Sequence, residues 1–160
     1  MHPTPSISKP FLIAVLAMGA FALSLVAFAG GAGAAGAACT PGVRTVDGKP
    51  ARVFCGPAKA TVRVGATTLT FKNGACEKSG GGYVVNIGTF FAGTTTSKKP
   101  YFGLLISKPK AGKYTGQVLS FRSNGVSRSA LATVTLKSLK SGTFSGKAFG
   151  AGLVTGSFTC

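Results

Sequence analysis

Few side chains in this sequence are able to perform acid–base chemistry. The 160 residues include only two carboxylates, Asp47 and Glu77, and one histidine, His2. A general acid or base must titrate near the working pH, and His, Asp and Glu supply most such groups. Asp47 precedes Gly48 in a predicted turn and Glu77 is placed in another turn beside Cys76, so we do not expect a glycosidase-type pair. We therefore predict a protein that is not an enzyme, although a serine–lysine dyad with a buried lysine stays open.

The four cysteines point to structural chemistry instead. Cys39, Cys55, Cys76 and Cys160 are separated by 16, 21 and 84 positions, with no Cys-x-x-Cys pair among them. These spacings do not match a zinc site, and no histidine follows that could activate a catalytic thiol, so we predict neither a metal nor a cofactor. An even number of cysteines in a small exported domain predicts two disulfides. Of the three pairings, we favour Cys39–Cys55 and Cys76–Cys160, because each would fasten a loose end of the chain to the sheet.

Positive charge dominates the remaining polar residues. Eighteen Lys and Arg residues face two acids, and only Lys9 precedes residue 39, so the rest of the chain carries 17 − 2 = +15. Such a field attracts anionic polymers and lipid headgroups. Two clusters with aromatic neighbours are the strongest candidates, and a strand over residues 101–107 would hold them about 20 Å apart at opposite ends of the domain. The candidate anion-binding residues are Lys98 and Lys99 in the first cluster and Lys108, Lys110, Lys113 and Tyr114 in the second.

The first 38 residues have the composition of an export segment. A short polar stretch precedes residues 11–29, which contain no charge, and residues 30–38 are only Gly and Ala. Nineteen uncharged residues are long for a signal-peptide core and close to the length that spans a bilayer. We favour a cleaved signal peptide, with a retained membrane anchor as the alternative and, because residues 36–39 resemble a lipobox, lipidation of Cys39 as a third option. The predicted location is extracytoplasmic, either secreted or attached to the outer face of the cell membrane.

Residues 39–160 are predicted to form one disulfide-bonded all-β domain. After Cys55, short alternating runs are separated by turn signals, the pattern of an antiparallel β-sandwich or barrel of about eight or nine strands. Asn73-Gly74 and Asn124-Gly125 are each suited to closing a tight hairpin. Residues 101–106 are almost continuously apolar, as expected for a strand covered on both faces. The expected strands are residues 61–64, 69–72, 83–91, 101–106, 113–121, 130–139, 143–149 and 153–160, with further turns at 79–82 and 109–112.

The end of the chain repeats a short pattern. Gly142-Thr-Phe-Ser is echoed by Gly156-Ser-Phe-Thr, which predicts a closing hairpin with glycines where sheets approach closely. Together with Phe71-x-Asn-Gly-x-Cys, this ending resembles small exported proteins of actinobacteria-like organisms, over about the last 90 residues. The export segment, the lipobox-like motif and a β-domain that ends in Cys160 are similar, more loosely, to mycobacterial lipoprotein antigens. The resemblance implies an exported β-domain and supplies no catalytic residues.

These observations predict an exported, non-catalytic binding module, secreted or associated with the cell envelope, for an anionic surface polymer or lipid headgroups. Nucleic acid is disfavoured as a partner because export separates the domain from it. The first alternative is a purely structural or antigen-like envelope protein, whose lysines are simply solvated loop residues. The second is a secreted enzyme or protease inhibitor, with residues 94–100 as a rigid exposed loop. The sequence does not indicate which ligand is bound or how many copies assemble.

Overall fold

The computed structural model describes residues 39–93, 96–108 and 110–160, and within these ranges it contains strands and turns but no α-helix. No helix among the described residues is long and apolar enough to cross a membrane. The predicted export segment, residues 1–38, lies outside the described residues. The ten strands are β1 (Gly42–Val46), β2 (Lys49–Phe54), β3 (Ala58–Val64), β4 (Thr67–Ser79), β5 (Gly82–Phe90), β6 (Tyr101–Ile106), β7 (Gly112–Ser123), β8 (Val126–Ser138), β9 (Ser141–Ala148) and β10 (Gly152–Thr159).

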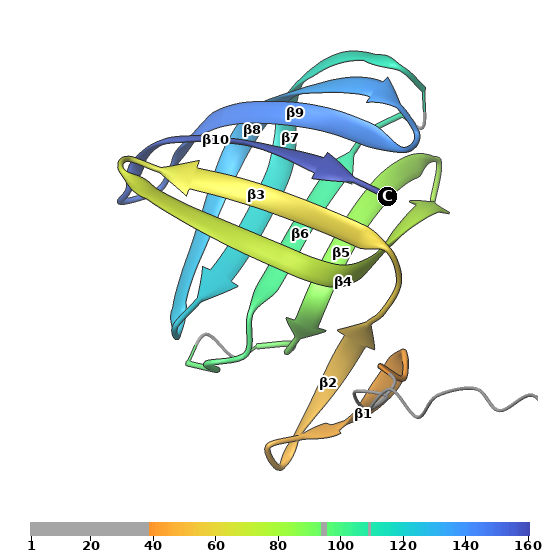
Figure 1. Cartoon of the computed structure of the whole chain (residues 1–160), viewed down its shortest axis with the longest axis vertical. Coiled ribbons are helices and arrows are strands. Elements are labelled where there is room, and N and C mark those ends of the chain that lie inside the picture. The colour runs from red at the N-terminus through yellow and green to blue at the C-terminus, as the bar shows by residue number, and fades with distance from the viewer. Residues whose placement is uncertain (1–38, 94–95, 109) are drawn as a thin grey trace, which may run out of the picture. The chain divides into compact units, whose positions relative to one another are not determined.

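Strands β3 to β10 form a closed antiparallel barrel of eight strands. Each strand pairs with the next in the chain, and β10 closes the circle by pairing with β3, from Val154 opposite Val64 to Thr159 opposite Lys59. This arrangement decides between the two predicted architectures in favour of the barrel. Figure 1 shows β3, β4, β9 and β10 as a front layer of the barrel wall, with β5–β8 as the back layer behind them.

The interior of the barrel is filled by its own side chains. Alternate residues of every barrel strand point inward, and Phe102, Phe158, Leu104 and Leu119 are almost completely buried. An eight-stranded barrel is just wide enough for side chains to fill it. The rings of Phe71 and Phe144 each lie 5.7 Å from the ring of Phe102, joining the two layers at the centre. The barrel therefore has a packed core, and any ligand must bind at its outside or its ends.

Strands β1 and β2 form a hairpin attached to the outside of the barrel. Residues 52–54 of β2 pair with residues 88–90 of β5, and the hairpin lies below the barrel in Figure 1. The turn at Asp47 and Gly48 joins the two strands with positive φ angles of 51° and 75°, as predicted. The strands themselves were not predicted, because β1 is almost wholly exposed and β2 alternates over only three residues, Ala51 to Val53, after Pro50.

Both favoured disulfides are present. Cys39 is bonded to Cys55 and Cys76 to Cys160, and no described cysteine is free. The first bond holds the start of the described chain to the segment between β2 and β3, and the second fastens the last residue to β4. They were favoured because the first would hold the N-terminal arm of the domain and the second its final residue. Two disulfides are consistent with an extracytoplasmic location.

One of the two predicted Asn-Gly hairpins is wrong. Asn124 and Gly125 close the β7–β8 hairpin with φ angles of 50° and 81°, but Asn73 and Gly74 lie inside β4. There Asn73, with a φ of 65°, marks the irregularity at which β4 leaves β3 and begins to pair with β5. Gly74 is required because a β-carbon would overlap Asn86 and Ile87. Glu77 consequently lies in the second half of β4 and not in a turn.

The prediction that β6 is covered on both faces is also wrong. Leu105 is 47% exposed, because the outer face of a barrel strand faces solvent unless another element covers it. The run reads as continuously apolar because its outward residues are Tyr101, Gly103 and Leu105. The ring of Tyr101 lies over Gly103, where a β-carbon would collide with it.

The repeated pattern at the end of the chain has a structural explanation. In the β9–β10 hairpin, Gly142 is opposite Phe158 and Phe144 is opposite Gly156. Each phenylalanine ring occupies the space that a side chain on the opposite glycine would need. Such glycine–aromatic pairs let a large ring lie flat within a crowded sheet. The predicted closing hairpin is therefore confirmed.

Candidate functional site

The two predicted lysine clusters lie at opposite ends of β6. Lys98 and Lys99 precede the strand, and Lys108 and Lys110 follow it. In a barrel whose strands alternate in direction, every second turn lies at the same end. The β4–β5, β6–β7 and β8–β9 turns therefore share one end, and the β3–β4, β5–β6, β7–β8 and β9–β10 turns share the other.

The end with the β4–β5, β6–β7 and β8–β9 turns concentrates positive charge, and we call it the lysine end. The six exposed lysines in and beside these three turns form no ion pair with any described residue. Lys113 is opposite Thr135, two residues before Lys137, so charges from two hairpins lie close together on the outer surface. The nearest acid in the chain is Glu77, in the second half of β4. The members of the lysine end are Lys78, Lys108, Lys110, Lys113, Lys137 and Lys140.

Half of this cluster was not among the predicted site residues. Lys108, Lys110 and Lys113 were predicted from their proximity in the sequence, whereas Lys78, Lys137 and Lys140 reach the same end only through the strand order. The alternating direction of successive strands was the one signal that could have found them. Without a correct strand count, that signal could not be read.

The turns at the lysine end are held by specific hydrogen bonds. The Tyr114 hydroxyl donates to the Lys110 carbonyl at 2.7 Å, so this predicted binding residue also braces the β6–β7 loop. The Gln117 side chain accepts from the Ser107 amide at 2.7 Å and steadies the other side of the loop. In the β8–β9 turn, the Cys160 amide donates to the Lys140 carbonyl at 2.8 Å. A fixed backbone reduces the entropy lost when a ligand gathers these lysines.

Tyr83 links the lysine end to the second disulfide. Its hydroxyl donates to the Leu139 carbonyl and lies 2.9 Å from the Cys160 sulfur. Burial raises the pKa of the Tyr83 hydroxyl above its ordinary value of 10.0. The hydroxyl therefore stays protonated at neutral pH and keeps its role as a hydrogen-bond donor.

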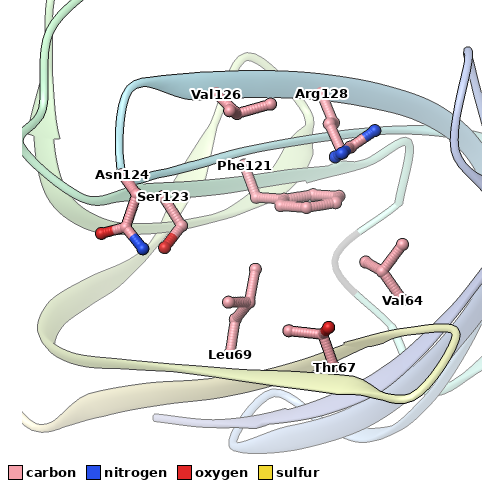
Figure 2. Close-up of a pocket in the computed structure, with 8 residues that line it drawn as sticks. All are labelled: Val64, Thr67, Leu69, Phe121, Ser123, Asn124, Val126 and Arg128. Atoms are coloured by element: carbon pink, nitrogen blue, oxygen red, sulfur yellow. The ribbon is translucent and has the colours of Figure 1, made fainter.

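The opposite end of the barrel has a hollow of about 300 Å³ at its mouth. Figure 2 shows Thr67 and Leu69 of β4 on one side of the hollow and Phe121 and Ser123 of β7 on the other. Arg128 is the one charged residue among those that line it. The hollow can accept a single anionic or polar group. The residues that line it include no carboxylate, histidine or thiol.

Beside this hollow, two basic residues, Arg122 and Lys99, hold the β5–β6 loop in place. Arg122 is buried, and its guanidinium donates to the Lys99 carbonyl at 2.9 Å and the Thr89 carbonyl at 2.7 Å while lying over the Phe91 ring. Burial lowers the pKa of Arg122 from its usual value, and the neighbouring Tyr101 partly offsets the effect. The Lys99 ammonium lies 3.7 Å from the Asp47 carboxylate.

The predicted binding residues therefore fall into two different environments. Lys108, Lys110, Lys113 and Tyr114 join further lysines at one end, whereas Lys98 and Lys99 lie at the other, where Lys99 is already paired. The loop that the inhibitor alternative requires belongs to this second end, and its residues 94 and 95 lie outside the described residues. Among the described residues, no group of three or more His, Cys, Asp and Glu side chains could hold a metal.

The two carboxylates lie on different elements of the fold. Asp47 lies in the β1–β2 turn beside Lys99, and Glu77 lies on β4 opposite Val84. Comparison with protein-family models, curated proteins and solved structures gives no match. A function for this protein therefore has to rest on the chemistry of its own residues.

Proposed function

We propose that this protein is an exported, non-catalytic binding module, and that its lysine end binds anionic polymers or lipid headgroups of a cell envelope. The observation that carries the proposal is the gathering of six exposed, unpaired lysines from three hairpins at one end of a rigid barrel. Because the barrel interior is filled, an extended or planar anionic partner suits this end better than an enclosed small molecule.

The expected strength follows from the number of cations. A lysine close to an anionic membrane surface contributes about 1 kcal/mol, and the contribution is screened within a Debye length of about 8 Å at physiological salt. Several lysines together can therefore hold the protein on an anionic surface, and added salt should release it. Lysine ammonium groups act as point charges without strict geometry, so the module should select charge density over a particular chemical group.

The test compares two variants with the same net charge. In the first, Lys108, Lys110 and Lys140 are changed to Gln at the lysine end. In the matched control, Arg44, Lys49 and Lys98 are changed to Gln on the β1–β2 hairpin and the β5–β6 loop. Binding of the exported chain would be measured on vesicles with and without phosphatidylglycerol, and on a soluble polyphosphate, to separate a lipid from a polymer partner.

We expect the lysine-end variant to bind about a hundredfold more weakly than the unaltered protein, since three lysines contribute roughly 3 kcal/mol. The control variant should lose less than about fivefold, through the general field alone. Equal losses of affinity in both variants would mean that the partner is attracted by the net charge of the whole protein, and that the lysine end is not a specific binding site. If the unaltered protein bound neither the anionic vesicles nor the polyphosphate at low salt, the proposed function would be overturned.

A further inference from the structure

The barrel mouth opposite the lysine end holds an arginine that points toward the inside of the barrel. Arg128 lies on the same face of β8 as Ala130 and Ala132, which are buried in the core. Arg128 itself is partly buried and stands directly opposite Phe121 on β7. Among the described residues it has no ion-pair or hydrogen-bond partner. A charge that is partly removed from water is costly unless an opposite charge or a hydrogen-bond acceptor meets it.

The described part of the chain offers no side-chain carboxylate to Arg128. Asp47 lies beside Lys99, and Glu77 lies in the second half of β4, toward the lysine end. Arg122, the buried arginine nearby, differs because its guanidinium donates to two backbone carbonyls. An anionic partner for Arg128 therefore has to come from another molecule.

The hollow beside Arg128 combines this charge with an apolar surface. Four of the eight residues that line the hollow are apolar, and they come from the β3–β4 and β7–β8 hairpins, which face each other across the mouth (Figure 2). With a volume of about 300 Å³, the hollow is at the lower limit of small-molecule sites, and the filled barrel core prevents deeper entry. The apolar lining residues are Val64, Leu69, Phe121 and Val126.

We propose that this mouth binds a small monocarboxylic acid with an apolar body, whose carboxylate pairs with Arg128. The guanidinium fork can donate two parallel hydrogen bonds to one carboxylate. One arginine balances one negative charge, whereas a phosphate monoester carries about two at neutral pH and would leave uncompensated charge beside apolar groups. The arrangement therefore favours a carboxylate over a phosphate.

The apolar body of the ligand would lie against the lining of the hollow. Val126 is 52% exposed, and Val64 and Leu69 are partly buried, so a group laid against them removes apolar surface from water. Because the hollow is small, only a compact body or the first few carbons of a chain can be covered. A polyanion such as polyphosphate gains nothing from this lining, so the mouth site and the lysine end select different ligands and neither depends on the other.

The experiment begins with four probes and the unaltered protein. Hexanoate and 3-phenylpropanoate would be titrated into isotopically labelled residues 39–160 at 0.15 M NaCl, which screens the general field of the protein. Acetate lacks the apolar body, and hexanamide lacks the charge. We expect the first two probes to shift the backbone amide NMR signals of residues 64–69 and 121–128. Their dissociation constants should be on the order of 1 mM, as suits ligands of about eight to eleven non-hydrogen atoms.

Acetate and hexanamide should each bind at least about tenfold more weakly than hexanoate. Acetate lacks the methylenes whose burial favours binding, and hexanamide cannot form the charge-assisted pair with Arg128. The relative affinities of hexanoate and 3-phenylpropanoate then show whether the apolar body is aliphatic or aromatic.

Three variants test the arginine itself. Arg128→Gln removes the charge and should weaken hexanoate binding about tenfold or more. Arg128→Lys keeps the charge but loses the planar fork, so we expect a smaller loss of about threefold. The matched control is Arg63→Gln, at an exposed arginine on the outer face of β3 near the same end of the barrel. It lowers the net charge equally and should change the affinity by less than about twofold.

Several results would overturn the proposal. Hexanamide that binds as tightly as hexanoate would show apolar contact without a role for the charge. Equal losses in Arg128→Gln and Arg63→Gln would show attraction by net charge, and shifts centred on residues 107–113 would place the acid at the lysine end. If Arg128→Gln failed to fold, the four probes and Arg128→Lys would still decide. Polyphosphate should bind Arg128→Gln and Arg63→Gln equally well, so failure of this site can be distinguished from failure of the proposed function.

Discussion

At the scale of single residues, Tyr83 is the group whose protonation matters most to the fold. Its hydroxyl donates to the Leu139 carbonyl from a buried position, and burial raises its pKa. A group whose pKa is higher in the folded than in the unfolded state contributes its full stability below the unfolded pKa. That contribution is lost as the pH rises through the folded pKa. The Tyr83 contribution is thus present at neutral pH and is lost above about pH 10.

We therefore expect Tyr83→Phe to cost about 1 kcal/mol of unfolding free energy at pH 7, the usual value of one hydrogen bond. The cost should shrink as the pH is raised above about 10, because the unaltered protein must then ionise a buried hydroxyl. Urea unfolding of both proteins between pH 7 and 11 would measure the difference. Tyr114→Phe, at a half-buried tyrosine, is the control, and a Tyr83 effect that stayed constant across this range would contradict the assignment.

Residues also show where sequence reasoning succeeds and where it fails. The dipeptide Asn-Gly occurs at residues 73–74 and at 124–125, and only the second closes a hairpin. Both tolerate positive φ. Whether the chain then folds back into a hairpin depends on which strand pairs with the residues that follow the dipeptide. At Asn73 the chain bends from one partner strand to another. Local residue types carry no signal for that choice, and the β3–β4 turn forms earlier, at residues 65–66.

At the scale of elements, the two disulfides hold parts of very different importance. Cys39–Cys55 fastens the β1–β2 hairpin, which lies outside the barrel, and Cys76–Cys160 joins β4 to the end of β10 across 84 positions. Both pairs were predicted, on the ground that each would fasten a loose end to the sheet. In the chain-entropy picture the longer loop contributes roughly 4–5 kcal/mol to stability and the shorter about 3.

We expect the Cys76→Ser, Cys160→Ser double variant to lose roughly 4–5 kcal/mol of global stability. The corresponding Cys39→Ser, Cys55→Ser variant should instead release the hairpin while the barrel stays folded, because few residues of β2 pair with β5. Hydrogen exchange would separate the two cases. In the second variant, protection should vanish for residues 42–54 and persist in β7 and β8. Equal loss of protection throughout the barrel in both variants would show that the hairpin is part of one cooperative unit.

The elements also explain why half of the lysine end was not among the predicted site residues. The alternation of apolar and polar residues predicted an all-β chain and most strands from residue 61 onward. It could not show that β10 returns to β3, because that pairing joins residues 90 to 100 positions apart. Barrel closure and strand count together decide which turns share an end. Lys137 and Lys140 therefore join Lys108 and Lys110 through topology, which a local pattern does not encode.

At the scale of the whole molecule, net charge governs both stability and binding. Seventeen basic residues against two acids after residue 38 make the folded chain repel itself. Raising the ionic strength from 0.01 to 0.15 M shortens the Debye length from about 30 to about 8 Å. We expect the melting temperature of residues 39–160 to rise by several degrees over this range, measured by calorimetry. The Arg44, Lys49, Lys98→Gln variant should show a smaller rise, and a melting temperature that falls with salt would contradict this picture.

The same screening should act in the opposite direction on ligand binding. Salt weakens attraction to an anionic partner while it stabilises the folded domain. If high salt raised the melting temperature and lowered the affinity for the anionic partner, release from the surface would not be caused by unfolding. This pairing of effects is specific to a strongly basic fold with few internal ion pairs.

The most direct test of the central claim is to map where an anionic polymer contacts the folded domain. Polyphosphate would be added to isotopically labelled residues 39–160 at low salt, and the backbone amide NMR signals would be followed. We predict that the largest shifts lie in the β4–β5, β6–β7 and β8–β9 turns, at residues 78–82, 107–113 and 137–141. Shifts centred on the mouth around Asn124 and Arg128, or spread evenly over the surface, would contradict the assignment of the lysine end as the binding site.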